Sequence, residues 1–340
     1  MTSHNLEETA RRLVAPGKGL LAADESFGTI EKRFQSINVP STEDNRRAYR
    51  ELLFSTPGLG AFISGVILFD ETIRQSTAGG VPFVELLRRQ GIIPGIKVDK
   101  GAKTMANFPG EKITEGLDGL RDRFKEYFDL GARFSKWRAV ITIGAGIPTR
   151  ACLEANAHAL ARYAALSQET GLVPVVEPEV LMDGTHTLEQ CAEVTERTQR
   201  IVFEALHEQR VAFEKMILKP NMVLPAKDCP QQADPHQVAA ATIRCLRRTV
   251  PAAVPGIAFL SGGQDDITAT RNLEAINELG PHPWRITFSY SRALENAPLK
   301  TWGGNPANVA AAQTALHHRA QFNSAAQLAQ YSAELETTPA

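Results

Sequence analysis

Short apolar segments alternate with helix-like segments along the whole chain, and this alternation constrains the fold more than any other feature. Strands that are apolar on both faces are typical of a parallel sheet covered by helices. The connections keep helical spacing, as in residues 185–206, where apolar side chains recur at i, i+3 and i+4. The strand-like segments are residues 19–26, 65–70, 95–100, 134–140, 173–179, 215–221, 256–263 and 284–291.

The spacing of these segments favours a closed barrel. From the fourth to the seventh, equivalent positions (136, 177, 219 and 261) are 41, 42 and 42 residues apart. A dinucleotide-binding sheet is the alternative, but residues 144–149 carry only two glycines of its fingerprint. The sequence therefore predicts an α/β fold, a (β/α)8 TIM barrel that forms a single domain over residues 1–340 with extra N- and C-terminal helices.

Proline and capping residues indicate where two helices begin. Asp234 precedes Pro235 and Asn305 precedes Pro306, which places a capping side chain before a proline at the first helical position. Residues 306–340 are predicted to form one or two closing helices and a short mobile tail.

Charge and composition exclude several classes of protein. The 37 Lys and Arg residues balance 38 Asp and Glu residues, so no global field attracts nucleic acid or an anionic membrane. No signal peptide and no run of about 18 apolar residues is present, so a cytoplasmic location is expected. The four cysteines form no CxxC pair and are expected to be reduced core residues.

Charged side chains interrupt the predicted strands near their C-terminal ends, where a parallel barrel holds its active site. Isolated buried charges are costly, so a shared polar cavity explains them better than separate outward-facing charges. Four are acidic and five are basic, which suits a phosphorylated substrate. They are Asp24, Asp99, Glu177, Glu179, Lys97, Lys136, Arg138, Lys219 and Arg292.

Glycine and hydroxyl residues follow three of the strands. Residues 260–263 (LSGG) and 289–292 (SYSR) end the seventh and eighth strands, whose loops form the usual phosphate site of a barrel. Residues 24–29 (DESFGT) give a second hydroxyl-rich turn after the first strand. Two separate anion sites would suit a bisphosphate.

These motifs together resemble the class I, Schiff-base-forming fructose-bisphosphate aldolases. The resemblance is carried in order by LAADES, GVILFDET, GIKVDKG, FSKWR, VPVVEPE, LKPNM, FLSGGQ, FSYSRAL and WGG. It implies a lyase of glycolysis and gluconeogenesis that cleaves fructose 1,6-bisphosphate to dihydroxyacetone phosphate and glyceraldehyde 3-phosphate. It also implies a homotetramer.

The resemblance implies roles for individual residues. Lys219 would form the Schiff base, Glu177 would be the main proton-transfer group, and Asp24, Lys136 and Glu179 would support catalysis. Phosphate or sugar contacts would come from Ser26, Thr29, Arg33, Lys97, Arg138, Ser261, Gly262, Gly263, Ser289 and Arg292. The chemistry agrees, because a protonated imine accepts the electron pair released when the C3–C4 bond breaks. A neutral amine must attack first, and burial beside the cation of Lys136 favours that form of Lys219.

Two features depart from the family pattern. Ser291 stands where the family commonly has Gly, which matters if that turn needs a positive φ. The chain ends soon after Tyr331, without the longer tail ending in tyrosine of animal members. Turnover or substrate preference is therefore expected to differ.

Other functions stay open from the sequence. A Schiff-base aldolase could prefer sedoheptulose 1,7-bisphosphate, tagatose bisphosphate or fructose 1-phosphate, and a non-catalytic scaffold or sugar-phosphate sensor could keep the same fold. A metal-dependent aldolase is disfavoured because the eight histidines show no ligand spacing. No metal and no other cofactor is expected.

Overall fold

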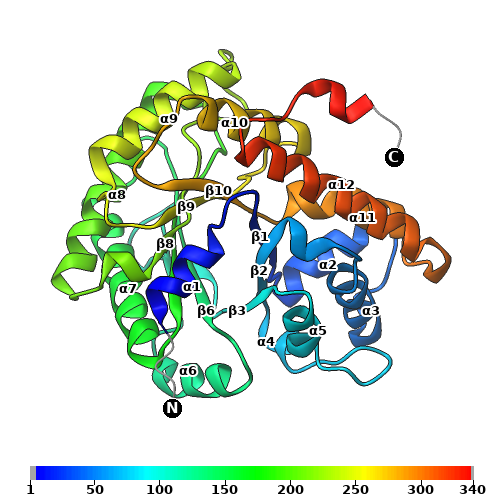
Figure 1. Cartoon of the computed structure of the whole chain (residues 1–340). Coiled ribbons are helices and arrows are strands. Elements are labelled where there is room, and N and C mark those ends of the chain that lie inside the picture. The colour runs from blue at the N-terminus through cyan, green and yellow to red at the C-terminus, as the bar shows by residue number, and fades with distance from the viewer. Residues whose placement is uncertain (1–4, 338–340) are drawn as a thin grey trace.

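The computed structural model describes residues 5–337, and its central element is a closed parallel barrel (Figure 1). The strands neighbour one another in the order β1-β10-β9-β8-β7-β6-β3-β2, so each is paired with the barrel strands before and after it in the chain. This confirms the predicted (β/α)8 barrel. The barrel strands are β1 (Gly19–Ala23), β2 (Ile63–Leu68), β3 (Ile93–Lys97), β6 (Phe134–Ile141), β7 (Val173–Val180), β8 (Ile217–Leu218), β9 (Gly256–Phe259) and β10 (Arg285–Tyr290).

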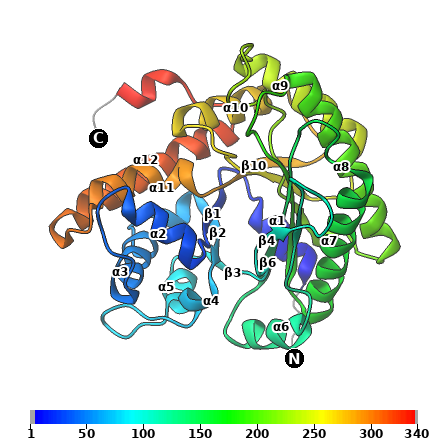
Figure 2. The same ribbon diagram turned by 180° about the vertical axis from the view of Figure 1, so that it is seen from behind.

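Helices surround the barrel, as the views from both sides show (Figures 1 and 2). The predicted helix start at Asp234 is confirmed, because its side chain accepts a hydrogen bond from Gln237 N–H in a reciprocal capping box. Asn305 caps a 3-10 turn, Pro306–Asn308, which leads into α12. The helices are α1 (Leu6–Leu13), α2 (Phe27–Gln35), α3 (Glu43–Phe54), α4 (Asp70–Ile73), α5 (Phe83–Arg89), α6 (Leu120–Asp129), α7 (Arg150–Thr170), α8 (Leu188–Glu208), α9 (Pro235–Thr249), α10 (Asp266–Glu278), α11 (Arg292–Trp302) and α12 (Val309–Gln327).

An antiparallel hairpin, β4 (Ala102–Thr104) with β5 (Lys112–Thr114), was not predicted from the sequence. The residues of β4 are exposed, so they lack the apolar pattern that marks the barrel strands. The hairpin lies between β3 and β6 in the chain and leaves the order of the barrel unchanged.

The interior of the barrel has an apolar floor. Leu13, the last residue of α1, and Val14 after it pack with inward-facing strand residues in one buried cluster and close the N-terminal end. A Cβ at position 95 would lie 2.3 Å from the Phe134 ring, so Gly95 makes room for that ring. The strand residues of the floor are Leu20, Ala22, Ile67, Ile93, Phe134, Val173, Val175, Ile217 and Ala258.

The next inward positions along four of these strands are charged. Successive side chains of a strand alternate between its two faces, so a residue two positions after a floor residue also points inward. These residues, taken in the order of their strands, are Asp24, Lys136, Glu177 and Lys219. The barrel interior therefore has an apolar layer below and a charged layer above it.

Helix α10 anchors the C-terminal segment through a buried carboxyl group. Glu274 accepts a hydrogen bond from Tyr331 N–H (3.0 Å), and its second oxygen has no hydrogen-bond partner among residues 5–337. Burial, opposed by that hydrogen bond, raises the pKa of Glu274 to about 7. Residues 338–340, the end of the segment predicted to be a mobile tail, lie outside the described residues.

Glu274→Gln is expected to stabilise the protein at pH 8. The carboxyl has a pKa of 4.5 when unperturbed and about 7 in the fold, so its contribution to stability is lost as pH rises through that range. Glutamine keeps the acceptor and adds no charge, so the free energy of unfolding should rise by about 2 kcal/mol at pH 8 and barely change at pH 4.5. Denaturant unfolding at both pH values, with exposed Glu208→Gln as control, measures the difference. An equal effect at both pH values would contradict the assignment.

Candidate active site

Three charged side chains form the centre of the barrel mouth. Glu177, on β7, lies between two lysines: its Oε1 is 3.3 Å from Lys219 Nζ and its Oε2 is 3.3 Å from Lys136 Nζ. Lys136 Nζ also pairs with Asp24 Oδ2 at 2.6 Å. All four side chains are buried, so each ion is held by its neighbours rather than by water.

The charges of Asp24 and Lys136 reinforce each other. Burial alone would raise the pKa of Asp24, but the ammonium groups of Lys136 and Lys219 hold it well below its ordinary value. Burial alone would lower the pKa of Lys136, whereas Asp24 and Glu177 raise it above its ordinary value. Asp24 is therefore a carboxylate and Lys136 an ammonium group at neutral pH.

Two further pairs form the wall of the mouth. Lys97 Nζ lies 3.0 Å from Asp99 Oδ1, and Asp99 also accepts hydrogen bonds from the backbone N–H groups of Gly101 and Arg138. The guanidinium group of Arg138 forms an ion pair with Glu179. Glu179 raises the pKa of Arg138 against the opposing effect of burial, so this cation stays charged.

The loops after β9 and β10 place hydroxyl groups and flexible backbone beside one another. Ser261 is buried, and Gly262 and Gly263 adopt left-handed φ values of 61° and 92°. Ser289 is buried and its hydroxyl has no hydrogen-bond partner among the described residues. Because Phe288 and Tyr290 pack in the cluster that includes the helices, Ser289 between them faces the barrel interior.

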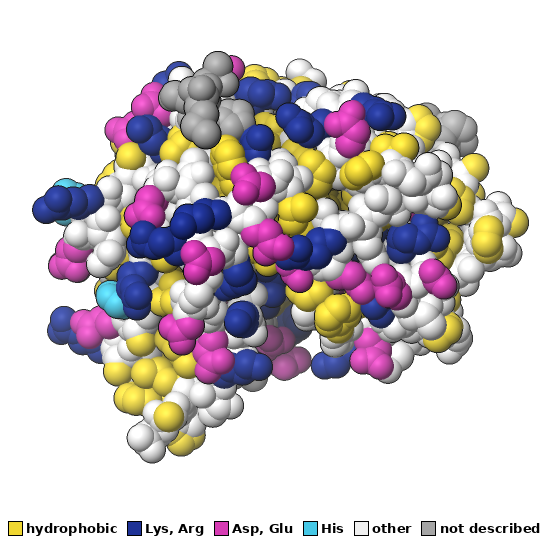
Figure 3. Space-filling model, turned by 90° about the horizontal axis from the view of Figure 1, so that it is seen from below, with side chains coloured by type: hydrophobic (Ala, Val, Ile, Leu, Met, Phe, Trp, Pro, Cys, Tyr) yellow, Lys and Arg dark blue, Asp and Glu magenta, His cyan; other side chains and the backbone are white. Residues whose placement is uncertain are grey.

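Arg292 begins α11 and is exposed at this mouth. Desolvation and the nearby charges of Arg33 and Arg138 lower its pKa, and Glu179 and Asp183 oppose that effect. The three guanidinium groups therefore make this part of the mouth positive. On the face of the molecule that Figure 3 shows, basic and acidic side chains are interspersed.

The turn after β1 leads into α2. Ser26 is the N-cap residue, and its Oγ lies 3.2 Å from Thr29 Oγ1. Arg33, on the same helix, forms ion pairs with Glu25 and with Glu295, and its Nη2 donates to Ser291 Oγ at 2.8 Å. The expected contact of Arg33 with phosphate stays a prediction, and within the protein this guanidinium has three partners.

Glu25 and Glu295 were not identified from the sequence. Arg33 and Arg50 hold the pKa of Glu25 at about 2 although burial would raise it, while burial and the charge of Glu25 raise the pKa of Glu295 well above its ordinary value. The two carboxyl groups therefore have opposite pKa shifts beside the same two arginines. Glu25 stands at the end of the strand-like segment 19–26, directly after Asp24, and Glu295 lies outside all of these segments. Neither was therefore singled out as a site residue.

The backbone at Ser291 removes one concern raised by the sequence. Its φ is −109°, so the turn does not use the left-handed region that favours glycine. Serine fits this position, and its hydroxyl joins the cluster of Glu25 and Arg33.

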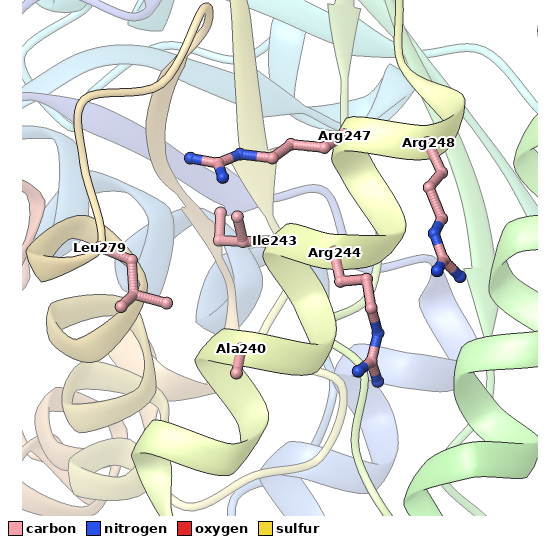
Figure 4. A pocket seen from close by; sticks show the side chains of 6 residues that line it. All are labelled: Ala240, Ile243, Arg244, Arg247, Arg248 and Leu279. Carbon is pink, nitrogen blue, oxygen red and sulfur yellow. The ribbon is translucent and has the colours of Figure 1, made fainter.

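A second pocket lies away from the barrel mouth, and the described residues form neither a metal site nor a membrane-spanning helix. This pocket of about 420 Å³ lies on the outside of the barrel and is lined by three arginines of α9 and by Leu279 at the end of α10 (Figure 4). Among residues 5–337, no group of three His, Cys, Asp or Glu side chains is arranged so that it could hold a metal ion. Within the same range, no helix has both the length and the apolar character needed to cross a membrane. The cysteines are buried free thiols, as expected.

The closed barrel and its charged mouth place the chain among the (β/α)8-barrel enzymes. The class I fructose-bisphosphate aldolase family matches residues 5–340. A probable fructose-bisphosphate aldolase class 1 of Xanthomonas axonopodis pv. citri is 57% identical over 97% of this chain and 99% of the relative. A cytosolic fructose-bisphosphate aldolase 4 of Arabidopsis thaliana is 53% identical over 98% and 85%.

A solved structure agrees with these sequence matches. The fructose-bisphosphate aldolase of Plasmodium falciparum, solved in complex with TRAP and a small-molecule inhibitor, superposes with a TM-score of 0.95 at 52% identity. The match covers 96% of this chain and 95% of that one. The chain therefore belongs to the class I fructose-bisphosphate aldolase family, and its function is that of a fructose-bisphosphate aldolase, a lyase of glycolysis.

Proposed function

We propose that Lys219 is the amine that forms the Schiff base with the C2 carbonyl of fructose 1,6-bisphosphate. The observation that supports this most strongly is the position of Lys219, buried in the charged layer with Glu177 3.3 Å from its Nζ. The neutral amine adds to the carbonyl to give a carbinolamine, and loss of water gives the protonated imine. This imine takes up the electron pair when the C3–C4 bond breaks.

Glu177 is proposed to transfer protons at the nitrogen-bearing carbon. As an acid it protonates the departing hydroxyl of the carbinolamine, and the resulting carboxylate is poised between two cations. Asp24 is proposed to take the proton of the C4 hydroxyl as glyceraldehyde 3-phosphate leaves, since the ammonium groups beside it keep it ionised. The remaining enamine is protonated and hydrolysed to dihydroxyacetone phosphate. Lys136 and Glu179 support these groups through their ion pairs.

The two phosphates are proposed to bind at two separate sets of residues in the mouth. One side offers the buried hydroxyls of Ser261 and Ser289, the backbone of Gly262 and Gly263, and the cation of Arg292. The other offers the hydroxyls of Ser26 and Thr29 at the start of α2, with Arg33 on that helix. Lys97 and Arg138 are proposed to contact the sugar chain or its phosphates.

Borohydride trapping tests the proposal. Reduction in the presence of fructose 1,6-bisphosphate should attach a triose phosphate irreversibly to Lys219, as peptide mass analysis detects. Activity should survive treatment with a chelator. Modification of another lysine, or loss of activity with the chelator, would contradict the assignment. Comparing kcat/KM for sedoheptulose 1,7-bisphosphate in the same assay establishes the preferred ketose.

Location and assembly are also proposals. Family resemblance supports a cytoplasmic homotetramer in which residues 1–340 form one domain. Sedimentation equilibrium of the full chain tests the assembly, and a mass other than that of four chains would contradict it.

A further inference from the structure

Lys227 lies in the loop between β8 and α9, opposite the turn that contains Gly263. This loop is tied to the loop after β7 by three backbone hydrogen bonds. Lys227 N–H donates to Met182 O (2.9 Å), Ala226 N–H to His186 O (2.9 Å) and Asp228 N–H to Gly184 O (3.1 Å). These hydrogen bonds hold the backbone of Lys227 in place, so a change of conformation at this position involves its side chain.

The side chain of Lys227 reaches the phosphate turn. A Cβ at position 263 would lie 3.2 Å from Lys227 Cε, 3.3 Å from Lys227 Nζ and 3.3 Å from Arg292 Nη2. The ammonium group of one loop and the guanidinium group of another thus approach the same point on Gly263. Glycine at this position leaves that space unfilled.

The positive charges of Lys227 and Arg292 repel each other beside Gly263, so an anion bound between them would be stabilised. Arg292 forms no ion pair among the described residues, and Arg33 and Arg138 already add positive charge near it. Lys227 is balanced by Asp183, whose Oδ1 lies 3.0 Å from its Nζ, but the two side chains are 44% and 65% exposed. An exposed pair of this kind contributes little to stability and exchanges readily. A dianionic phosphate can therefore displace Asp183.

We propose that Lys227 is a specificity-determining residue of this aldolase, which leaves Asp183 and binds the phosphate held by Ser261, Gly263 and Arg292. The inference rests on the proposed phosphate site of these loops. Lysine suits the role because its flexible stem lets one ammonium group move between two anionic partners. Binding by both cations favours a phosphate dianion over a hydroxyl or a monoanion at this end of the substrate.

Lys227→Met tests the inference, because methionine keeps the stem and removes the charge. KM for fructose 1,6-bisphosphate is expected to rise about tenfold with kcat nearly unchanged, and the inhibition constant of inorganic phosphate should rise with it. The dependence of KM on salt should become shallower. Lys125→Met serves as the control, since Lys125 is also exposed and paired, with Asp122 on α6.

A double-mutant cycle separates this role from a general change of charge. Asp183→Asn should lower KM about threefold in the wild type, because Lys227 is released, and should have a clearly smaller effect in the Lys227→Met background, where only the influence of Asp183 on Arg292 remains. An unchanged KM in Lys227→Met, or an Asp183→Asn effect that is as large without Lys227 as with it, would overturn the inference. Borohydride trapping at Lys219 in the same preparations tests the Schiff-base function separately.

Discussion

Lys219→Ala is expected to abolish imine formation and to lower kcat/KM for fructose 1,6-bisphosphate by about 10⁴-fold or more. Without the amine, the C2 carbonyl cannot become a protonated imine, and the C3–C4 electron pair has no acceptor. Other side chains of the mouth keep their pairs, because Lys136 still contacts Asp24 and Glu177. Weak bisphosphate binding should therefore persist and be measurable by calorimetry, while borohydride adds no mass to the protein.

Lys215→Ala provides a matched control. Lys215 precedes β8, whereas Lys219 follows it, so the two lysines lie at opposite ends of the same strand. The control variant should form the imine and keep its activity. Imine trapping in Lys219→Ala would disprove the assignment of the nucleophile. Complete loss of bisphosphate binding in a folded variant would contradict separate phosphate sites.

The barrel could be predicted because burial on both faces leaves a strong signal. Each of the eight predicted segments contains or overlaps a barrel strand, but their lengths were less well predicted. Residues 256–263 were treated as one segment, whereas β9 ends at Phe259 and the following residues form the phosphate turn. The β8 strand has only two residues, Ile217–Leu218. In the sequence, the serine and glycines that follow the apolar residues look like a continuation of the strand. In the structure, the backbone turns away from the sheet at these residues.

The charged layer could be predicted for the same reason. A lysine or glutamate inside an apolar strand is costly to bury alone, so its presence there indicates a shared polar site. The ion pairs among these residues could not be predicted from the sequence. Glu177 contacts Lys136 and Lys219 only because three strands lie side by side in the barrel. Family resemblance supplied the roles, and these stay proposals.

Ion pairs between distant loops and helices could not be predicted. Arg33 of α2 meets Glu295 of α11 across 262 residues of sequence, and Lys227 reaches Gly263 from another loop. A charge in a loop or on a helix is ordinarily solvated, so neither stands out in the sequence. Glu25 and Glu295 are buried beside Arg33 of α2 and Arg50 of α3, and these contacts exist only in the folded chain.

Glu177→Gln is expected to lower kcat by about 10³-fold while Lys219 remains able to add to the substrate. Glutamine has nearly the same shape but cannot give a proton to the leaving hydroxyl of the carbinolamine. It also replaces one of the two carboxyl oxygens, which lie 3.3 Å from Lys136 Nζ and from Lys219 Nζ, by an amide group. The step that loses water should therefore become rate-limiting, and the fraction of enzyme trapped by borohydride at short times should fall.

The test compares kcat with the rate of imine trapping in the same preparations. Glu204→Gln on the exposed side of α8 is the matched control and should leave both quantities unchanged. Circular dichroism separates a chemical defect from unfolding, which is a real risk because the substitution leaves Lys136 with Asp24 as its remaining ion-pair partner. If folded Glu177→Gln enzyme kept kcat within tenfold of the wild type, proton transfer would have to be assigned to another carboxyl group. Asp24 would be excluded from that donor role, because the cations around it keep it ionised.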